Sequence, residues 1–153
     1  MLDNTGFNNQ IPDVEGLAPK ENIKAWVDRK SYIHNFGNAA AAYAGYLAMP
    51  GATYLYEVLE DEDVRGFTRE AMMQSADILM KKYPGEFTAV FLEGHIDDLL
   101  SRFRNRALGD TVFRVGCDLA RKLHRNDRVL SPLMDGVAEG LPVDKVLDVF
   151  LCG

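Results

Sequence analysis

Apolar residues recur at helical spacing along most of this chain, and that periodicity restricts the fold more than any other feature. One helical face between residues 87 and 104, for example, carries Phe91, Ile96, Leu99, Leu100 and Phe103. The period-two alternation that marks half-buried strands is not sustained between any pair of turn signals. The pattern therefore predicts an all-α fold, a bundle-like domain of about seven or eight helices with short connections.

The chain divides into a short lead-in and one helical domain. Residues 1–18 mix glycine, proline and asparagine with scattered apolar residues, which is typical of an extended segment. Residues 19–153 carry the helical pattern and are numerous enough to bury a core of their own. We therefore expect an extended lead-in over residues 1–18 and an all-helical domain over residues 19–153.

Polar residues and a Pro-Gly pair mark where individual helices begin and end. The acidic stretch 61–63 supplies a cap and a negative first turn for a long helix. Asn35 has the side chain of an N-cap, and it precedes a helix expected over residues 38–48. Pro50-Gly51 then ends that helix.

Composition argues against several classes of function. The net charge of -6 is unfavourable for non-specific nucleic-acid binding, which needs a basic surface. No stretch approaches the roughly 18 consecutive apolar residues of a membrane span. Cys117 and Cys152 lie far apart, as free thiols of a reducing compartment do, so we expect a cytoplasmic protein. The three histidines lack any ligand spacing, and we expect no metal site.

Two groups of polar residues are candidates for a functional site. Lys30, Asn35 and Asn38 gather where one expected helix ends and the next begins. Arg114 and Lys122 are eight residues apart, so on one helix they would project within roughly 80° of each other and could clamp an anion or sugar hydroxyls. An ordinary helix cap beside a solvated lysine, together with a solvated basic face, explains the same spacing. Spacing alone leaves both interpretations open.

Four stretches match, in order, the pattern of a known family. They are residues 29–38, 102–110, 114–123 and 126–142. The first looks like a Lys-x4-Asn-x2-His motif, with Lys30, Asn35 and Asn38 at its three positions. The second is similar to an Arg-Phe-x-Asn-Pro-x-x-x-Asp segment, and the others are similar to the basic and closing helices that follow it. The sequence thus resembles the C-terminal domain of the mannitol dehydrogenase and mannitol-1-phosphate dehydrogenase family, the long-chain polyol dehydrogenases.

The resemblance implies a domain of a two-domain NAD(P)-dependent enzyme. In that family an N-terminal Rossmann domain binds NAD or NADP, and an all-α domain of the polyol and 6-phosphogluconate dehydrogenase type carries the catalytic lysine. Lys30 matches this general base, and Asn35 matches the asparagine that steadies the oxyanion. Asn38, Arg114 and Lys122 match positions that contact the substrate. That substrate would be a sugar alcohol or its phosphate, of the mannitol/fructose or mannitol 1-phosphate/fructose 6-phosphate type.

Some features of the sequence depart from the family pattern. There is no Gly-x-Gly-x-x-Gly or phosphate-loop motif, so we expect a missing Rossmann domain to bind the cofactor, with residues 1–18 leading in from it. The chain alone should then be inactive. Asn38 replaces the family histidine and cannot titrate, and Arg106 replaces a proline. A second hypothesis is therefore a non-catalytic helical binding or interaction module that kept the fold and lost the chemistry.

Overall fold

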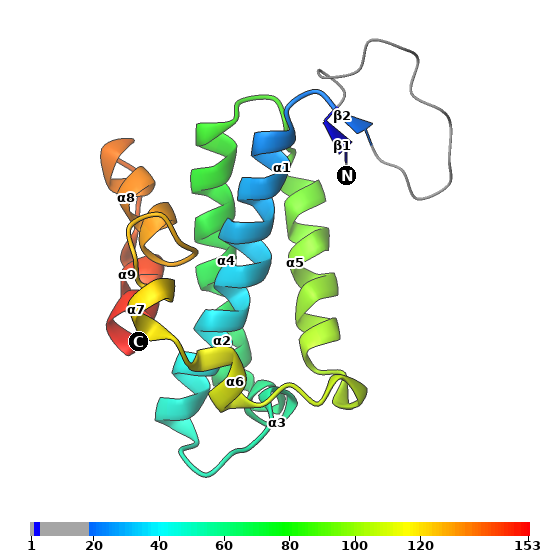
Figure 1. The fold of residues 1–153 in the computed structure, drawn as a ribbon, viewed down its shortest axis with the longest axis vertical. Coiled ribbons are helices and arrows are strands. Elements are labelled where there is room, and N and C mark those ends of the chain that lie inside the picture. The colour runs from blue at the N-terminus through cyan, green and yellow to red at the C-terminus, as the bar shows by residue number, and fades with distance from the viewer. Residues whose placement is uncertain (1, 4–18) are drawn as a thin grey trace.

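A continuous helical rod from Ile23 to Ala48 forms the centre of the fold. In the computed structural model, which describes residues 2–3 and 19–153, this rod has three parts. They are α1 (Ile23–Arg29), a π-helical turn (Lys30–Asn35), here called the π segment, and α2 (Phe36–Ala48). Figure 1 shows the rod running alongside the long helices α4 and α5.

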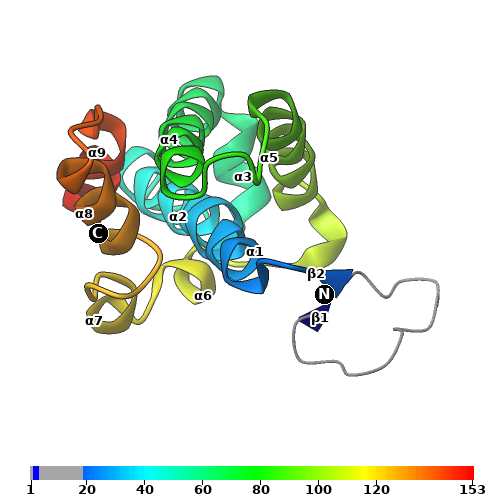
Figure 2. The same cartoon turned by 90° about the horizontal axis from the view of Figure 1, so that it is seen from above.

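Seven further α-helices surround the rod. They are α3 (Leu55–Glu60), α4 (Glu62–Lys82), α5 (Ala89–Phe103), α6 (Val112–Gly116), α7 (Leu119–Lys122), α8 (Leu130–Ala138) and α9 (Asp144–Cys152), with a 3-10 turn at Arg106–Leu108. Seen from above in Figure 2, α8 and α9 lie to one side of α4 and α5 to the other. The expected all-α bundle is confirmed. The rod and these seven helices make eight within the described residues.

A very short sheet was not anticipated by the sequence pattern. β1 (Leu2–Asp3) pairs in parallel with β2 (Pro19–Lys20), which lies directly before the rod. The remainder of the expected lead-in, residue 1 and residues 4–18, falls outside the described part of the chain. None of the helices in that described part is long and apolar enough to cross a membrane.

Small residues let α2 approach its neighbours closely. Ala39, Ala40, Ala41 and Ala42 are all buried. A Cβ added at Gly37 would stand 2.5 Å from the sulfur of Met72 on α4, and one added at Gly45 would stand 2.6 Å from the Val58 side chain on α3. At Gly45 the branched Val58 side chain leaves no room for a Cβ, whereas at Gly37 the flexible end of Met72 would have to move. α2 therefore packs directly against α3 and α4.

Two expectations about helix ends are settled by the backbone. Asp61 caps α4 as expected, its carboxylate accepting hydrogen bonds from the N–H groups of Asp63 and Val64 at 3.0 Å. The expectation that Asn35 is an N-cap is wrong, because Asn35 has helical angles and its side chain makes no capping bond. The helix does not restart there. It begins at Ile23, where the side chain of Asn22 accepts from the N–H of Ala25.

Candidate functional site

The π segment changes which side chains of the rod share a face. The N–H of Phe36 donates to the carbonyl of Ser31, five residues earlier, which is the defining bond of a π turn. In an α-helix two residues five apart point about 140° away from each other. In a π turn a residue and the fifth after it lie one above the other, since the backbone bond joins them. Lys30 and Asn35 therefore lie on one face because the rod is π-helical between them.

The three rod residues expected at the site differ in their surroundings. Lys30 is exposed, whereas Asn35 and Asn38 are half-buried. The side-chain oxygen of Asn38 is buried and finds no hydrogen-bond partner among the described residues. A buried carbonyl oxygen that lacks a partner is costly, so such an atom is suited to accept a hydrogen bond from a ligand.

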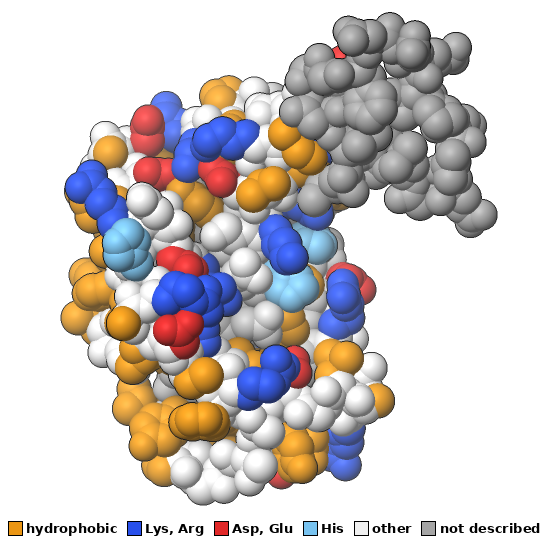
Figure 3. Space-filling model, in the orientation of Figure 1, with side chains coloured by type: hydrophobic (Ala, Val, Ile, Leu, Met, Phe, Trp, Pro, Cys, Tyr) orange, Lys and Arg blue, Asp and Glu red, His pale blue; other side chains and the backbone are white. Residues whose placement is uncertain are grey.

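His34, which lies four residues after Lys30, marks a positively charged environment. Its ring packs against Phe103 of α5 with centroids 5.6 Å apart. Burial lowers the pKa of His34, and the positive charges of Arg102, Lys30 and Arg128 lower it further. The imidazole is therefore neutral at pH 7. Figure 3 shows histidine and basic side chains adjoining one another on the face seen in Figure 1.

Arg114 and Lys122 are not on one helix, so the expected 80° relation between them is wrong. The chain breaks at Cys117-Asp118, where Asp118 has a φ of 67°, and α6 ends before it while α7 begins after it. Arg114 is exposed and pairs with Asp110. Lys122 is buried, its ammonium donates to the carbonyl of Val115, and burial lowers its pKa.

Arg128 is a basic residue that spacing did not single out. Its side chain is 18% exposed and its Nε donates to Asp127 at 2.8 Å. The charge of Arg128 acts on His34 of the π segment, on the buried Tyr43 of α2 and on Lys122 of α7. Among the basic residues between α6 and α8, Arg128 is therefore one whose charge influences residues of both the rod and α7. Its only sequence signal is its place in the matched stretch 126–142.

An apolar groove opens at the far end of α2, with a volume of about 730 Å³. Tyr43, Cys117 and Cys152 contribute to its lining, which contains no lysine, arginine, aspartate or glutamate. We assign no chemistry to this groove. Among residues 2–3 and 19–153, no three histidine, cysteine, aspartate or glutamate side chains are grouped as metal ligands would be.

A known family matches this chain in sequence, and a solved structure matches it in fold. Residues 22–150 match the family described as the mannitol dehydrogenase C-terminal domain. A similar solved structure is Pseudomonas fluorescens mannitol 2-dehydrogenase, determined as a ternary complex with NAD and D-mannitol. The two superpose with a TM-score of 0.71 at 19% identity, over 90% of this chain and 26% of the other. This chain therefore spans about a quarter of that enzyme and shares its fold there. On the family match, the chain belongs to the mannitol dehydrogenase C-terminal domain family.

Proposed function

We propose that this chain is the substrate-binding and catalytic domain of an NAD(P)-dependent polyol dehydrogenase. The observation that carries the proposal is the π segment, which lines up Lys30 with Asn35 in a chain of this family. A lysine and an amide donor on one face are the groups needed to remove a hydroxyl proton and to steady the oxygen left behind. π turns inside α-helices occur frequently at functional sites.

Each residue has a distinct proposed role in the oxidation of a sugar alcohol. Lys30 takes the proton from the reacting hydroxyl as the general base. The amide N–H of Asn35 donates to the same oxygen as negative charge develops on it. The unpaired oxygen of Asn38 accepts from a neighbouring substrate hydroxyl.

The other two proposed substrate contacts need some rearrangement. Arg114 is exposed, and it would exchange Asp110 for the substrate. Lys122 would move away from the carbonyl of Val115. Both side chains are able to hold a phosphate as well as hydroxyls, so a polyol phosphate such as mannitol 1-phosphate is a proposed substrate beside an unphosphorylated hexitol.

The cofactor is proposed to be held by another domain of the same polypeptide. NAD or NADP would supply the acceptor for the hydride that leaves the carbinol carbon. The sequence has no glycine-rich dinucleotide motif, and in residues 2–3 and 19–153 no strand leads into a glycine-rich turn and helix. This chain would then provide only the side of the active site that contacts the substrate.

Calorimetric titration of this chain with NADH tests the division between the two domains. We expect no measurable heat of binding. The pyrophosphate of a dinucleotide is usually bound by backbone N–H groups where a glycine-rich turn leads into a helix, and the described residues contain no such turn. Micromolar binding of NADH to the chain alone would contradict the proposed division.

A steady-state assay of the full-length gene product tests the function itself. A panel of polyols and polyol phosphates is offered with NAD and with NADP. Reduction of one cofactor by at least one member of the panel is expected. A folded full-length protein that is inactive with every combination of substrate and cofactor would favour the second candidate, the non-catalytic module. The asparagine at position 38, where the family has histidine, supports that candidate.

A further inference from the structure

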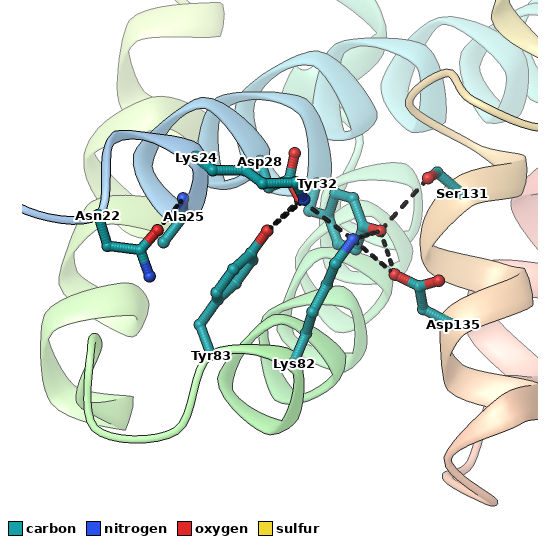
Figure 4. A network of polar contacts seen from close by, with 9 residues as sticks. All are labelled: Asn22, Lys24, Ala25, Asp28, Tyr32, Lys82, Tyr83, Ser131 and Asp135. Carbon is teal, nitrogen blue, oxygen red and sulfur yellow. Dashed lines mark hydrogen bonds and ion pairs between the residues drawn. The ribbon is translucent and has the colours of Figure 1, made fainter. Parts of the chain in front are cut away.

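Behind the π segment, a network of polar contacts ties Tyr32 to α4 and α8 (Figure 4). The hydroxyl of Tyr32 donates to Asp135 at 2.5 Å and accepts from the ammonium of Lys82 at 2.9 Å. Lys82 also lies 2.8 Å from Asp135 and 3.0 Å from Asp28 of α1. Ser131 of α8 is 3.3 Å from the same hydroxyl. We call these five residues the Tyr32 network.

The charges in the Tyr32 network hold one another in place. Burial raises the pKa of Tyr32, and its hydrogen bond to Asp135 raises it further, so the phenol keeps its proton. Burial alone would lower the pKa of Lys82, but the bonds with Asp135, Tyr32 and Asp28 outweigh it, and the pKa is raised overall. At neutral pH the network is a protonated phenol and an ammonium between two carboxylates.

A second contact holds the backbone of the same residue. The hydroxyl of Ser75 on α4 donates to the main-chain carbonyl of Tyr32 at 2.8 Å, and both residues are buried. A π turn interrupts the regular ladder of helix bonds, and a carbonyl within it gains from a partner outside the helix. Tyr32 is thus held from α4 through its side chain and through its backbone.

Tyr32 points away from the face that carries Lys30. Residues two positions apart in a helix project to opposite sides, and in agreement Tyr32 is 1% exposed whereas Lys30 is exposed. We propose that the Tyr32 network and the Ser75 bond fix the π segment in register, which makes Tyr32 and Ser75 positioning residues for the Lys30–Asn35 pair. This inference rests on the proposed function, since it concerns the geometry of the same site.

Register is what the Lys30–Asn35 pair depends on. If the rod relaxes to an α-helix between them, the two side chains diverge by about 140° and cannot reach one oxygen. A displacement of about 1 Å from productive geometry is already able to lower turnover by about 100-fold. The two contacts on Tyr32 oppose that relaxation without touching substrate.

The test uses three variants of the full-length protein: Tyr32→Phe, Ser75→Ala and the matched control Tyr83→Phe. Tyr83 follows the last residue of α4 and donates its hydroxyl to Asp28 at 2.6 Å. Its loss leaves the bonds of Tyr32 with Asp135, Lys82 and Ser75 in place. We expect kcat for polyol oxidation to fall at least about 10-fold in Y32F and S75A, with KM for the cofactor unchanged. Y83F should stay within about twofold of wild type, since its loss leaves the register intact.

Hydrogen exchange, read by mass spectrometry on the same proteins, separates positioning from general loss of structure. Peptides covering residues 30–36 should exchange at least about 10-fold faster in Y32F and S75A, while peptides from α5 keep the wild-type rate. Wild-type kcat in both variants, or unchanged exchange over residues 30–36, would overturn the inference. If wild-type protein oxidises no polyol, the proposed function fails, and exchange alone then decides whether the contacts hold the π segment.

Discussion

Replacement of Lys82 by methionine tests how much the Tyr32 network contributes to stability. Methionine keeps most of the stem and its packing, so the change removes the ammonium and its three contacts, at 2.8 Å to Asp135, 2.9 Å to Tyr32 and 3.0 Å to Asp28. What remains is a phenol beside two carboxylates whose oxygens lie within about 6 Å of each other, a distance at which like charges repel.

The magnitude follows from how far water reaches the network. Removing one partner of a fully buried ion pair destabilises by about 3–5 kcal/mol. The side chains of Lys82, Asp28 and Asp135 are 27%, 20% and 35% exposed, so solvent screens part of that loss. We therefore expect a decrease of about 2 kcal/mol in the free energy of unfolding. For a chain of this size the melting temperature should fall by about 4–8 °C.

Thermal unfolding followed by circular dichroism at pH 7.5 measures this effect. The control is Lys145→Met, which removes an exposed pair with Glu70 and should leave the melting temperature unchanged. The deficit of K82M should shrink at pH 4.5, because an orphaned carboxylate takes up a proton. In the wild-type protein burial raises the pKa of Asp28, but its bonds from Tyr83 and Lys82 outweigh this and lower it. Equal melting temperatures for K82M and K145M would refute the reasoning.

Two further predictions concern packing and pH. Gly45→Ala should lower the free energy of unfolding by about 1–3 kcal/mol, because the new Cβ overlaps Val58. Gly66→Ala, which has open space around it, should raise that free energy by up to about 1 kcal/mol. Urea unfolding measures both. The folded-state pKa of His34 is lowered below 6.5, so its contribution to stability is complete above pH 6.5 and is lost as the pH falls. Between pH 7.5 and 5.5 the melting temperature of His34→Gln should therefore fall less than that of the wild type. The exposed control His124→Gln should follow wild type.

The helical fold could be predicted from the sequence because its signals are local. Apolar periodicity marks the long helices. Asp61 has the side chain and the position of an N-cap, and it does cap α4. The break between α6 and α7 is only weakly marked in the sequence. Gly116 ends α6, but a single glycine within a helical pattern is tolerated and does not by itself indicate a break. Asp118 takes positive φ, which aspartate tolerates better than most residues. Arg114 and Lys122 were therefore placed on one helix wrongly.

The π segment could not be predicted, because distant residues decide it. Asn35 has the chemistry of a cap, and local preference alone favours a helix start there. The contacts that hold a continuous rod come from Ser75 and Lys82, more than 40 residues further along the chain. Lys30, Asn35 and Asn38 were found as candidates, but the reason why the first two are five residues apart becomes visible only in the backbone. Arg128 gave no separate signal.

The most direct test of the central claim is the turnover of Lys30→Ala in the full-length protein. Removing a general base lowers kcat by roughly 100-fold or more, and since Lys30 is exposed the melting temperature should stay at the wild-type value. Lys81→Ala, an exposed lysine at the end of α4, is the control and should keep wild-type turnover. Loss of turnover in K30A alone is the predicted result. Near-normal polyol oxidation by a folded K30A protein would contradict the account.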